Sequence, residues 1–320
     1  IQWLSDRIKL EETDASRVLR IPLKDDGTEY SVEMLYEDQK EIVAVVFDTL
    51  KEFLTMDDIA DFKPLRLIIT GQGGSGKSVV INTIVTLMRN MFGVDDVVKV
   101  VAPTGVAAYN VHGETFHHLL HMGVTKGEYK SNNMPNTTRM DLIKRFKILM
   151  AMIIDERSLV SSKILGTAEA MISETIFDGG HMQGDSWGGL PVLMLVGDDY
   201  QLPGIGEGPL TALYSRYGTK MTYKGRRALM ECSKFVMELG GSKRLQSSQS
   251  DAKAMLDRIR IGEDVQDEDV DKLMSLHLDS MEAKHGKAVV DDISSRAMFL
   301  FYRNEKCIRH NLTKLVAVSS

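Results

Sequence analysis

The 320-residue sequence has few cysteines and few aromatic residues, and it contains no long apolar run. Cys232 and Cys307 are too few for a disulfide framework or a cysteine zinc cage, which favours a reducing intracellular compartment. No apolar run approaches the roughly 18 residues of a membrane helix, and no signal-like start is present, so we expect no membrane association. Because the chain begins at Ile1 and ends without a helix cap, we expect a fragment of a longer protein.

An excess of positive charge is also missing. The chain carries 39 Lys and Arg against 45 Asp and Glu, and the resulting net charge of −6 excludes a protein that coats nucleic acid through global charge. The charge is blocky, since residues 220–260 hold ten basic and four acidic side chains, whereas residues 263–292 hold three basic and ten acidic ones. Any nucleic-acid binding must therefore use a local groove. The basic stretch fits a DNA path and a solvated helical face equally well.

The apolar pattern along the chain alternates between helical and strand-like segments. Residues 37–54 repeat apolar side chains at helical spacing, and a β-branched run at 65–70 precedes the glycine-rich segment GQGGSGKS and a second helical pattern. Further buried strands are predicted at residues 97–101, 148–154, 192–196 and 298–301. Strands spaced this widely, with helical stretches between them, predict an α/β fold with a parallel sheet.

The glycine-rich segment Gly71–Ser78 matches G-x-x-x-x-G-K-[ST] in full, between a predicted strand and a predicted helix. Such glycines let backbone N–H groups surround phosphate oxygens, and the helix N-terminus adds a favourable dipole. Lys77 would reach the β and γ phosphates, and Ser78 would ligate Mg²⁺. A chance glycine turn is the alternative, expected roughly once in a hundred chains of this length. The motif predicts nucleotide binding through Gly71, Gly73, Gly74, Ser75, Gly76, Lys77 and Ser78.

Hydrolysis needs a second set of groups for the metal and the attacking water, and acidic residues after a neighbouring strand provide it. In KILMAMIIDE, Asp155 would hold Mg²⁺ and Glu156 would polarise the water as general base. The alternative is that the two acidic residues only mark the point where the chain leaves the strand and reaches the surface. In LPVLMLVGDDYQLPGIG, Gln201 is the candidate that contacts the γ-phosphate, with a glycine and proline turn as the alternative.

Six segments in order carry a specific resemblance: GQGGSGKS, APTGVAAYNVHGETFHHLL, MIIDERSLV, WGGLPVLMLVGDDYQLP, KRLQ followed by MLDRIRIGE, and LFYRNEKCIRHN. This series resembles the petite-integration-frequency (PIF) family of superfamily one DNA helicases, relatives of the RecD type, over about residues 35–315. The resemblance implies a P-loop NTPase fold. It places a RecA-like motor domain at residues 34–235, after an N-terminal extension at 1–33 and before the start of a second motor domain at 236–320.

The resemblance also assigns roles to single residues. It implies that Gln39 reads the adenine of ATP, that Gln201 senses the γ-phosphate, and that Arg244 contacts the γ-phosphate from the second domain. It further implies that the segment from Pro103 to His117 contacts the backbone of single-stranded DNA, through Pro103, Thr104, Gly105, Thr115 and His117.

The function implied by the resemblance is an ATP-dependent DNA helicase that uses ATP and Mg²⁺ to translocate 5′ to 3′. Its partners would be single-stranded DNA and forked duplex DNA, and it would act as a monomer. The resemblance also implies that it is located in the nucleus or mitochondrion and that it acts in DNA repair, recombination or telomere maintenance. One alternative is a truncated nucleotide-binding module of helicase origin without turnover. The other is a P-loop ATPase unrelated to nucleic acid, which APTGVAA and GDDYQLP disfavour.

The sequence departs from the family pattern at several positions. Arg157 stands where the family usually has an apolar residue, and Asp199 stands where it usually has Phe. Gly204 replaces the second proline of Gln-Leu-Pro-Pro, and Leu245 separates Arg244 from the following glutamine.

The family's later motifs, which include an arginine that completes the ATP site between the two domains, have no counterpart after Asn311. Four histidines within ten residues suggest zinc as an alternative, but the sequence offers them no nearby partner pair of Cys or acidic ligands. They are His112, His117, His118 and His121.

Overall fold

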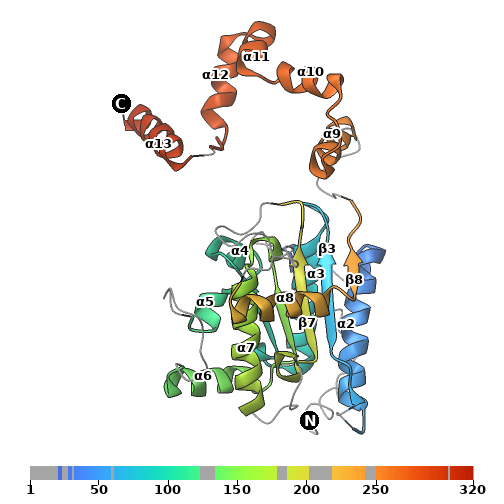
Figure 1. The fold of residues 1–320 in the computed structure, drawn as a ribbon. Coiled ribbons are helices and arrows are strands. Elements are labelled where there is room, and N and C mark those ends of the chain that lie inside the picture. Colours follow the sequence, from blue (N-terminus) through green and yellow to red (C-terminus); the bar gives the residue numbers. More distant parts are fainter. Residues whose placement is uncertain are drawn as a thin grey trace. The chain divides into compact units, whose positions relative to one another are not determined.

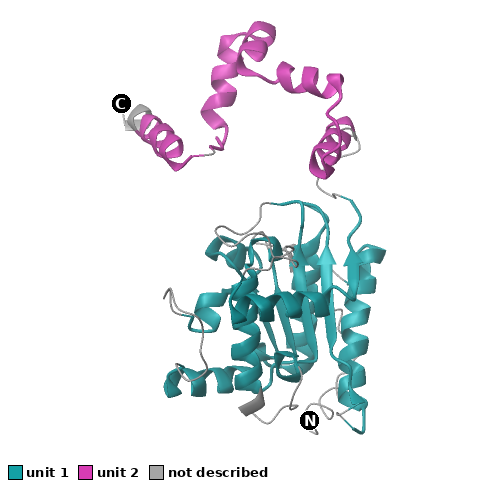
Figure 2. Cartoon of the chain, in the orientation of Figure 1, with its two compact units in different colours: residues 1–246 teal, residues 247–320 magenta. Residues whose placement is uncertain are grey.

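The computed structural model of the chain describes residues 21–23, 28–30, 32–58, 61–122, 134–178, 186–201, 218–241, 250–301 and 303–319. The chain divides into two units, residues 1–246 and 247–320 (Figure 2). The first unit extends past residue 235, the end of the first domain expected from the sequence, because the strand β8 (Val236–Glu238) pairs within its sheet.

A six-stranded parallel sheet organises the first unit (Figure 1). Its order is β5-β4-β6-β7-β3-β8, with β3 (Leu65–Thr70), β4 (Val98–Ala102), β5 (Glu114–Thr115), β6 (Ala151–Ile154) and β7 (Val192–Gly197). Every neighbouring pair in this sheet is parallel. The α/β prediction is confirmed, and four of the five predicted strands correspond to β3, β4, β6 and β7.

Successive residues of the central strands face two different cores. In β7, Val192, Met194 and Val196 pack on one side, whereas Leu193 and Leu195 pack on the other. This alternation follows from the two-residue period of a strand, and it explains why the strand reads as a continuous apolar run, since both faces are buried.

Helices cover both faces of the sheet (Figure 1). One core contains residues of α2 (Glu37–Thr55) and α3 (Lys77–Phe92). The other contains residues of α5 (Phe116–Leu119), α6 (Asn136–Phe146), α7 (Ser162–Asp178) and α8 (Lys220–Cys232). This unit also contains the short helix α4 (Gly105–Asn110) and the 3-10 turns η1 (Val32–Met34), η3 (Asp95–Val97), η5 (Arg157–Leu159) and η6 (Ser186–Gly189).

Helices α7 and α8 cross at two glycines. A Cβ on Gly225 would collide with the backbone oxygen of Ser162, and a Cβ on Gly166 would collide with that of Met221. The missing side chains therefore allow the two helix backbones to touch, which a larger residue at either crossing position would prevent.

We expect Gly225→Ala to lower the free energy of unfolding by about 1–3 kcal/mol, because overpacking at the crossing outweighs the better helix propensity of Ala. Urea unfolding followed by the fluorescence of the fully buried Trp187 measures the change. Gly105→Ala is the matched control, since a Cβ there meets nothing within 4 Å. Equal destabilisation by the two changes would contradict the close crossing.

The N-terminal segment adds a small antiparallel hairpin of β1 (Ile21–Leu23) and β2 (Thr28–Tyr30). The second unit is helical in its described part. It contains α9 (Ser250–Ile261), α10 (Asp267–Ser275), α11 (Leu278–His285), α12 (Lys287–Arg296) and α13 (Asn304–Ser319).

The prediction of a strand at residues 298–301 is wrong. These residues form no strand, and Met298 and Leu300 are 89% and 92% exposed. A short apolar run becomes a strand only when another strand pairs with it, and the described part of the second unit contains none.

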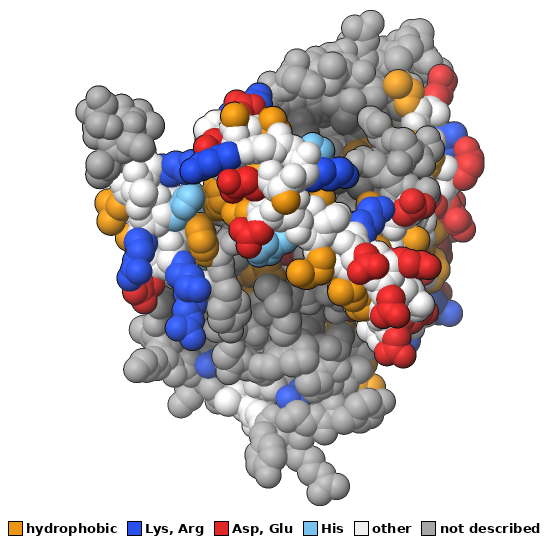
Figure 3. All heavy atoms as spheres, turned by 90° about the horizontal axis from the view of Figure 1, so that it is seen from above, with side chains coloured by type: hydrophobic (Ala, Val, Ile, Leu, Met, Phe, Trp, Pro, Cys, Tyr) orange, Lys and Arg blue, Asp and Glu red, His pale blue; other side chains and the backbone are white. Residues whose placement is uncertain are grey.

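No helix in the described ranges is both long and apolar enough to cross a membrane. Among the described residues on the face seen in Figure 3, acidic and basic side chains are interspersed with hydrophobic ones. This mixture agrees with a chain whose net charge is moderate and negative.

Candidate functional site

The glycine-rich loop joins β3 to α3 at the carboxyl edge of the sheet. Gly74 and Gly76 have φ angles of +84° and +95°, in the left-handed region that favours glycine. The Lys77 ammonium donates to the backbone oxygens of Gly71 at 2.7 Å and Gln72 at 3.1 Å, so it folds back over the loop. The Ser75 hydroxyl is buried and has no hydrogen-bond partner among the described residues. A loop with a lysine and an unsatisfied polar atom suits a polyanionic ligand.

Gln39 lies against this loop, although it precedes Gly71 by 32 positions and β3 lies between them in the sequence. Its side chain is 3% exposed, and its Oε1 accepts a hydrogen bond from the Tyr36 backbone N–H at 3.1 Å in the first turn of α2. A Cβ on Gly76 would collide with Gln39 Nε2. The structure therefore brings Gln39 next to the loop.

The first turn of α2 is fixed from the other side by Asp38, a contact that the motifs did not indicate. Its Oδ2 accepts a hydrogen bond from the Gly240 backbone N–H at 2.8 Å, and its Oδ1 accepts from the Gln39 backbone N–H at 3.0 Å. Gly240 follows β8, so the sheet edge and the helix that carries Gln39 are tied together.

Asp155 and Glu156 follow β6 at the same carboxyl edge. Asp155 is 7% exposed, and its backbone N–H donates to the Val101 oxygen at 2.9 Å. Glu156 has a left-handed backbone, with φ 51° and ψ 47°, and its Oε2 is buried with no hydrogen-bond partner among the described residues. A strained backbone that aims an unpaired carboxylate inward is typical of a functional turn.

The pKa of Asp155 is raised from 3.8 to about 6, mainly by burial and in smaller part by the neighbouring Glu156 carboxylate. The Glu156 backbone N–H and the charge of Lys77 act in the opposite direction. Because the charge of Lys77 acts on the pKa of Asp155, the glycine-rich loop and the turn of Asp155 and Glu156, here called the acidic turn, belong to one site. Carboxylate and hydroxyl oxygens are the ligands that Mg²⁺ prefers, so Asp155 and Ser78 fit that ion.

We expect Asp155→Asn to raise the free energy of unfolding of the nucleotide-free protein above pH 6. A carboxyl whose pKa is raised in the folded state destabilises that state once it ionises, so the penalty is absent below pH 3.8 and complete above about pH 6. The rise corresponds to about 3 kcal/mol. Urea unfolding of both proteins at pH 7.5 and pH 4 measures the difference. A wild type as stable as the variant at pH 7.5 would contradict the strain on this carboxylate.

Gln201 follows β7, which lies between β3 and β6 in the sheet. It is exposed, and its backbone N–H donates to the Asp198 oxygen at 3.2 Å. Asp198 is 2% exposed, and its Oδ1 accepts from the Tyr200 backbone N–H at 3.1 Å. Asp198 belongs to none of the predicted site residues, although its place directly after a buried strand is a signal for a buried turn residue.

The predicted DNA-contacting residues lie at the carboxyl ends of two further strands, β4 and β5. Thr104 and Thr115 cap α4 and α5, with their hydroxyl oxygens accepting backbone N–H bonds at 3.2 Å each. Ala102 of β4 lies opposite Thr115 of β5, so the Pro103–Gly105 segment and the Thr115–His117 segment lie at adjacent strand ends. Thr104, Gly105 and His117 are exposed. The structure thus brings both segments to one accessible edge.

Arg244, Leu245, Gln246 and Gly204 lie outside the described residues. Of the clustered histidines, His118 Nδ1 contacts Glu114 Oε2 at 2.5 Å, and His121 Nε2 contacts Asp141 Oδ2 at 3.0 Å. In the described part of the chain, no three His, Cys, Asp or Glu side chains gather as a metal site would require.

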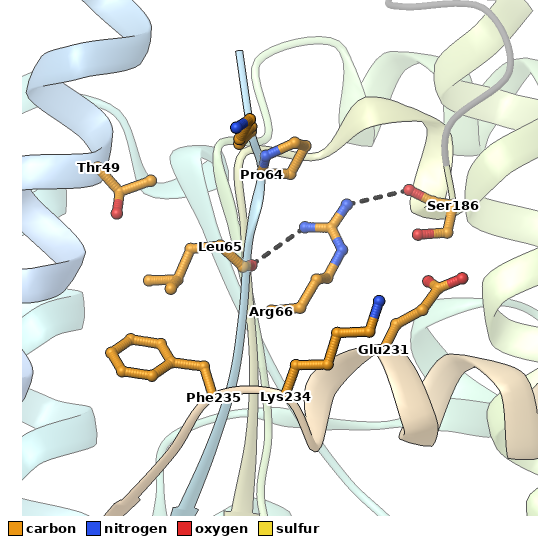
Figure 4. Close-up of a pocket in the computed structure, with 9 residues that line it drawn as sticks. Thr49, Pro64, Leu65, Arg66, Ser186, Glu231, Lys234 and Phe235 are labelled. Atoms are coloured by element: carbon orange, nitrogen blue, oxygen red, sulfur yellow. Dashed lines mark hydrogen bonds between the residues drawn. The ribbon is translucent and has the colours of Figure 1, made fainter.

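A surface pocket of about 500 Å³ lies at the opposite end of β3, lined by Lys63, Arg66, Glu231 and Lys234 among others (Figure 4). The guanidinium of Arg66 donates hydrogen bonds to the backbone oxygens of Leu65, Leu190 and Ser186 at 2.8–3.1 Å. These hydrogen bonds connect the start of β3 to the backbone that precedes β7. A six-residue strand spans about 20 Å. This pocket is therefore separate from the glycine-rich loop.

Arg157 and Asp199, which stand out in the sequence only as departures from the family pattern, form an ion pair in the structure. Arg157 Nη2 donates to Asp199 Oδ2 at 2.6 Å. The pair joins the Asp155–Glu156 turn to the turn that carries Gln201. No spacing rule connects residues that are 42 positions apart.

Comparison with known proteins agrees with this arrangement. The family profile described as "PIF1-like helicase" matches residues 34–265. The ATP-dependent DNA helicase RRM3 of Saccharomyces cerevisiae is 29% identical over 145 residues, which are 45% of this chain and 19% of that protein. The ATP-dependent DNA helicase Pif1 of Bdellovibrio bacteriovorus is 30% identical over 138 residues, which are 43% of this chain and 29% of that protein. The chain therefore spans less than a third of the length of these relatives.

Solved structures show a similar fold. The crystal structure of Pif1 helicase from Candida albicans superimposes with a TM-score of 0.54 at 24% identity, covering 75% of this chain and 46% of that one. Bacteroides Pif1 bound to single-stranded DNA gives a TM-score of 0.50 at 21% identity, covering 76% and 50%. Since the family profile matches more than half of the residues, the chain belongs to the PIF1-like helicase family.

Proposed function

We propose that this chain binds and hydrolyses ATP at the carboxyl edge of its sheet as the motor of a DNA helicase that moves 5′ to 3′ on single-stranded DNA. One observation carries the proposal: the loop with Lys77, the acidic turn with Asp155 and Glu156, and the exposed segments at Thr104 and His117 all follow strands of one parallel sheet. Ligands of parallel sheets bind at that edge.

Within the proposed site, each side chain has a distinct task. Lys77 and the loop N–H groups bind the phosphates, and Gln39 contacts the adenine. Mg²⁺, for which Ser78 and Asp155 are the proposed ligands, supplies positive charge to the phosphate oxygens. Glu156 accepts a proton from the attacking water as general base, and its buried, unpaired Oε2 is available for that task.

Sensing and DNA contact complete the proposal. Gln201 is placed beside the γ-phosphate and reports its loss to the turn after β7, and Arg244 adds charge from the following segment. Pro103, Thr104, Gly105, Thr115 and His117 contact the DNA backbone, which needs hydroxyl, imidazole and backbone donors rather than a base code. The two capping threonines use their oxygens as acceptors in the structure, so their hydroxyl hydrogens are available for phosphate oxygens.

Relatives extend the proposal to partners and processes. The Bacteroides protein was solved with single-stranded DNA, and a further Pif1 structure concerns forked double-stranded DNA. We extend both substrates to this chain, as a monomer in the nucleus or mitochondrion, acting in DNA repair, recombination or telomere maintenance.

Polarity is tested with two partial duplexes that carry either a 5′ or a 3′ single-stranded tail. The proposal predicts ATP-dependent strand displacement from the 5′-tailed substrate only. The Lys77→Ala variant is the control for ATP dependence. Displacement from the 3′-tailed substrate alone would contradict the proposed direction, and displacement without ATP would contradict the motor.

A nucleotide-binding module without turnover is the second candidate. It is favoured by the described part of the second unit, residues 250–301 and 303–319, which contains helices and no strand. Motors of this kind hydrolyse ATP when two domains close over the nucleotide. Tight binding of a fluorescent ATP analogue, without phosphate release on any DNA, would favour this candidate over the motor.

A further inference from the structure

Arg157 and Asp199 form an ion pair that joins the turn of Asp155 and Glu156 to the turn of Gln201. Arg157 directly follows Glu156 and is 4% exposed. Asp199 lies just past the end of β7, two residues before Gln201, and its side chain is 41% exposed. The 2.6 Å hydrogen bond between Nη2 and Oδ2 therefore spans the ends of β6 and β7, which are neighbouring strands.

The surroundings of Arg157 are shaped for this arginine. A Cβ on Gly197 would lie 2.7 Å from Arg157 Cγ and 3.0 Å from its backbone nitrogen, so the last residue of β7 leaves room for the side chain. Arg157 Nε is buried with no hydrogen-bond partner among the described residues. Asp199 is thus the acidic partner on which the buried guanidinium depends, and removing it would leave a buried charge uncompensated.

Each partner sits in a turn that carries a candidate catalytic side chain. On one side, the Leu159 backbone N–H donates to the Glu156 oxygen at 3.0 Å and closes the turn that holds Glu156 in its left-handed conformation. On the other, the Gln201 backbone N–H donates to the Asp198 oxygen at 3.2 Å. A movement of either turn would be transmitted through the ion pair to the other.

We propose that the Arg157–Asp199 ion pair is a positioning device that fixes Glu156 relative to Gln201, so that the general base and the γ-phosphate sensor keep a common geometry. This inference rests on the proposed hydrolysis at the site. Both residues are positioning residues, since neither is assigned to ATP, metal or water. Misplacement of a catalytic group by about 1 Å costs up to a hundredfold in rate, so a pair at this location has a large effect on turnover.

The first test is a double-mutant cycle on ATP hydrolysis. Asp199→Asn and Arg157→Met are each expected to lower kcat about tenfold while KM for ATP changes by less than about twofold. The double variant is expected to lose less than the product of the two single losses, because removing both charges leaves no buried cation without a partner. Asp141→Asn is the matched control, since Asp141 is 45% exposed, pairs with Arg145 at 2.9 Å, and has no role in the site. Multiplicative losses, or losses confined to KM, would overturn the proposal.

The second test is hydrogen exchange of the nucleotide-free chain, which decides the coupling even if the chain has no turnover. Asp199→Asn is expected to speed exchange of the Leu159 and Val160 amides, which donate to the backbone oxygens of Glu156 and Arg157 at 3.0 and 3.1 Å. Because Asp199 is exposed enough to be replaced without burying a new group, this variant serves if Arg157→Met does not fold. Unchanged exchange in residues 157–160 would overturn the proposal. Absent turnover in a folded wild type would instead contradict the proposed function.

Discussion

Replacing Lys77 by Ala is expected to reduce the rate of ATP hydrolysis by at least about a hundredfold and to weaken ATP binding as well. The ammonium donates to two loop oxygens at 2.7 and 3.1 Å, and its charge lowers the pKa of the otherwise strained Asp155. It is therefore the positive charge that lies within reach of both the loop and the acidic turn. A triphosphate bound in the loop would lose its principal side-chain cation in the variant.

Phosphate release and equilibrium binding of a fluorescent ATP analogue measure the two effects. Lys99→Ala is the control, because Lys99 is a similarly shielded lysine that pairs with Asp96 at 2.6 Å at the start of β4, away from the loop. Lys99→Ala is expected to keep the wild-type rate. A Lys77→Ala variant that retains more than about a tenth of the wild-type rate would contradict the assignment.

Glu156→Gln is expected to lower the hydrolysis rate by about 10²- to 10⁴-fold while the affinity for ATP stays near that of the wild type. Gln keeps the size of the side chain and removes its ability to take a proton. The buried Oε2 has no partner among the described residues, so the substitution breaks no hydrogen bond that the structure shows. The loss should therefore fall on the chemical step and not on folding or binding.

The control for this variant is Glu174→Gln. Glu174 lies on α7, pairs with Arg139 of α6 at 2.8 Å, and is a partly shielded glutamate like Glu156. Its hydrolysis rate is expected to match the wild type. If Glu156→Gln weakened ATP binding as much as it slowed turnover, Glu156 would be a binding residue and not a general base.

Much of this site could be predicted from sequence because parallel strands bring their carboxyl ends to one edge. Once the apolar runs at 65–70, 148–154 and 192–196 were identified as strands, Lys77, Asp155 and Gln201 had to lie along that edge. The position of Gln39 beside Gly76 needed the resemblance, because nothing in the residues alone joins α2 to the loop.

The remaining features depend on tertiary pairing. The run at 298–301 has a strand-like composition but no neighbouring strand in the described part of its unit. The strand β8 is only three residues long and mostly exposed. The apolar pattern therefore gives the wrong secondary structure for the first segment and no strand signal for the second. The Arg157–Asp199 pair joins two residues that read separately as anomalies. The buried Arg157 is accounted for by the carboxylate of Asp199, and this contact is apparent only from the tertiary structure, in which the two turns are adjacent.

Phosphate release by the wild-type chain, measured with and without single-stranded DNA, tests whether this chain is a motor that hydrolyses ATP on DNA. We expect the hydrolysis rate to rise when single-stranded DNA is added and to fall to the background in the Glu156→Gln variant under the same conditions. A folded chain that binds ATP and releases phosphate at the same rate with and without DNA would contradict the proposed motor.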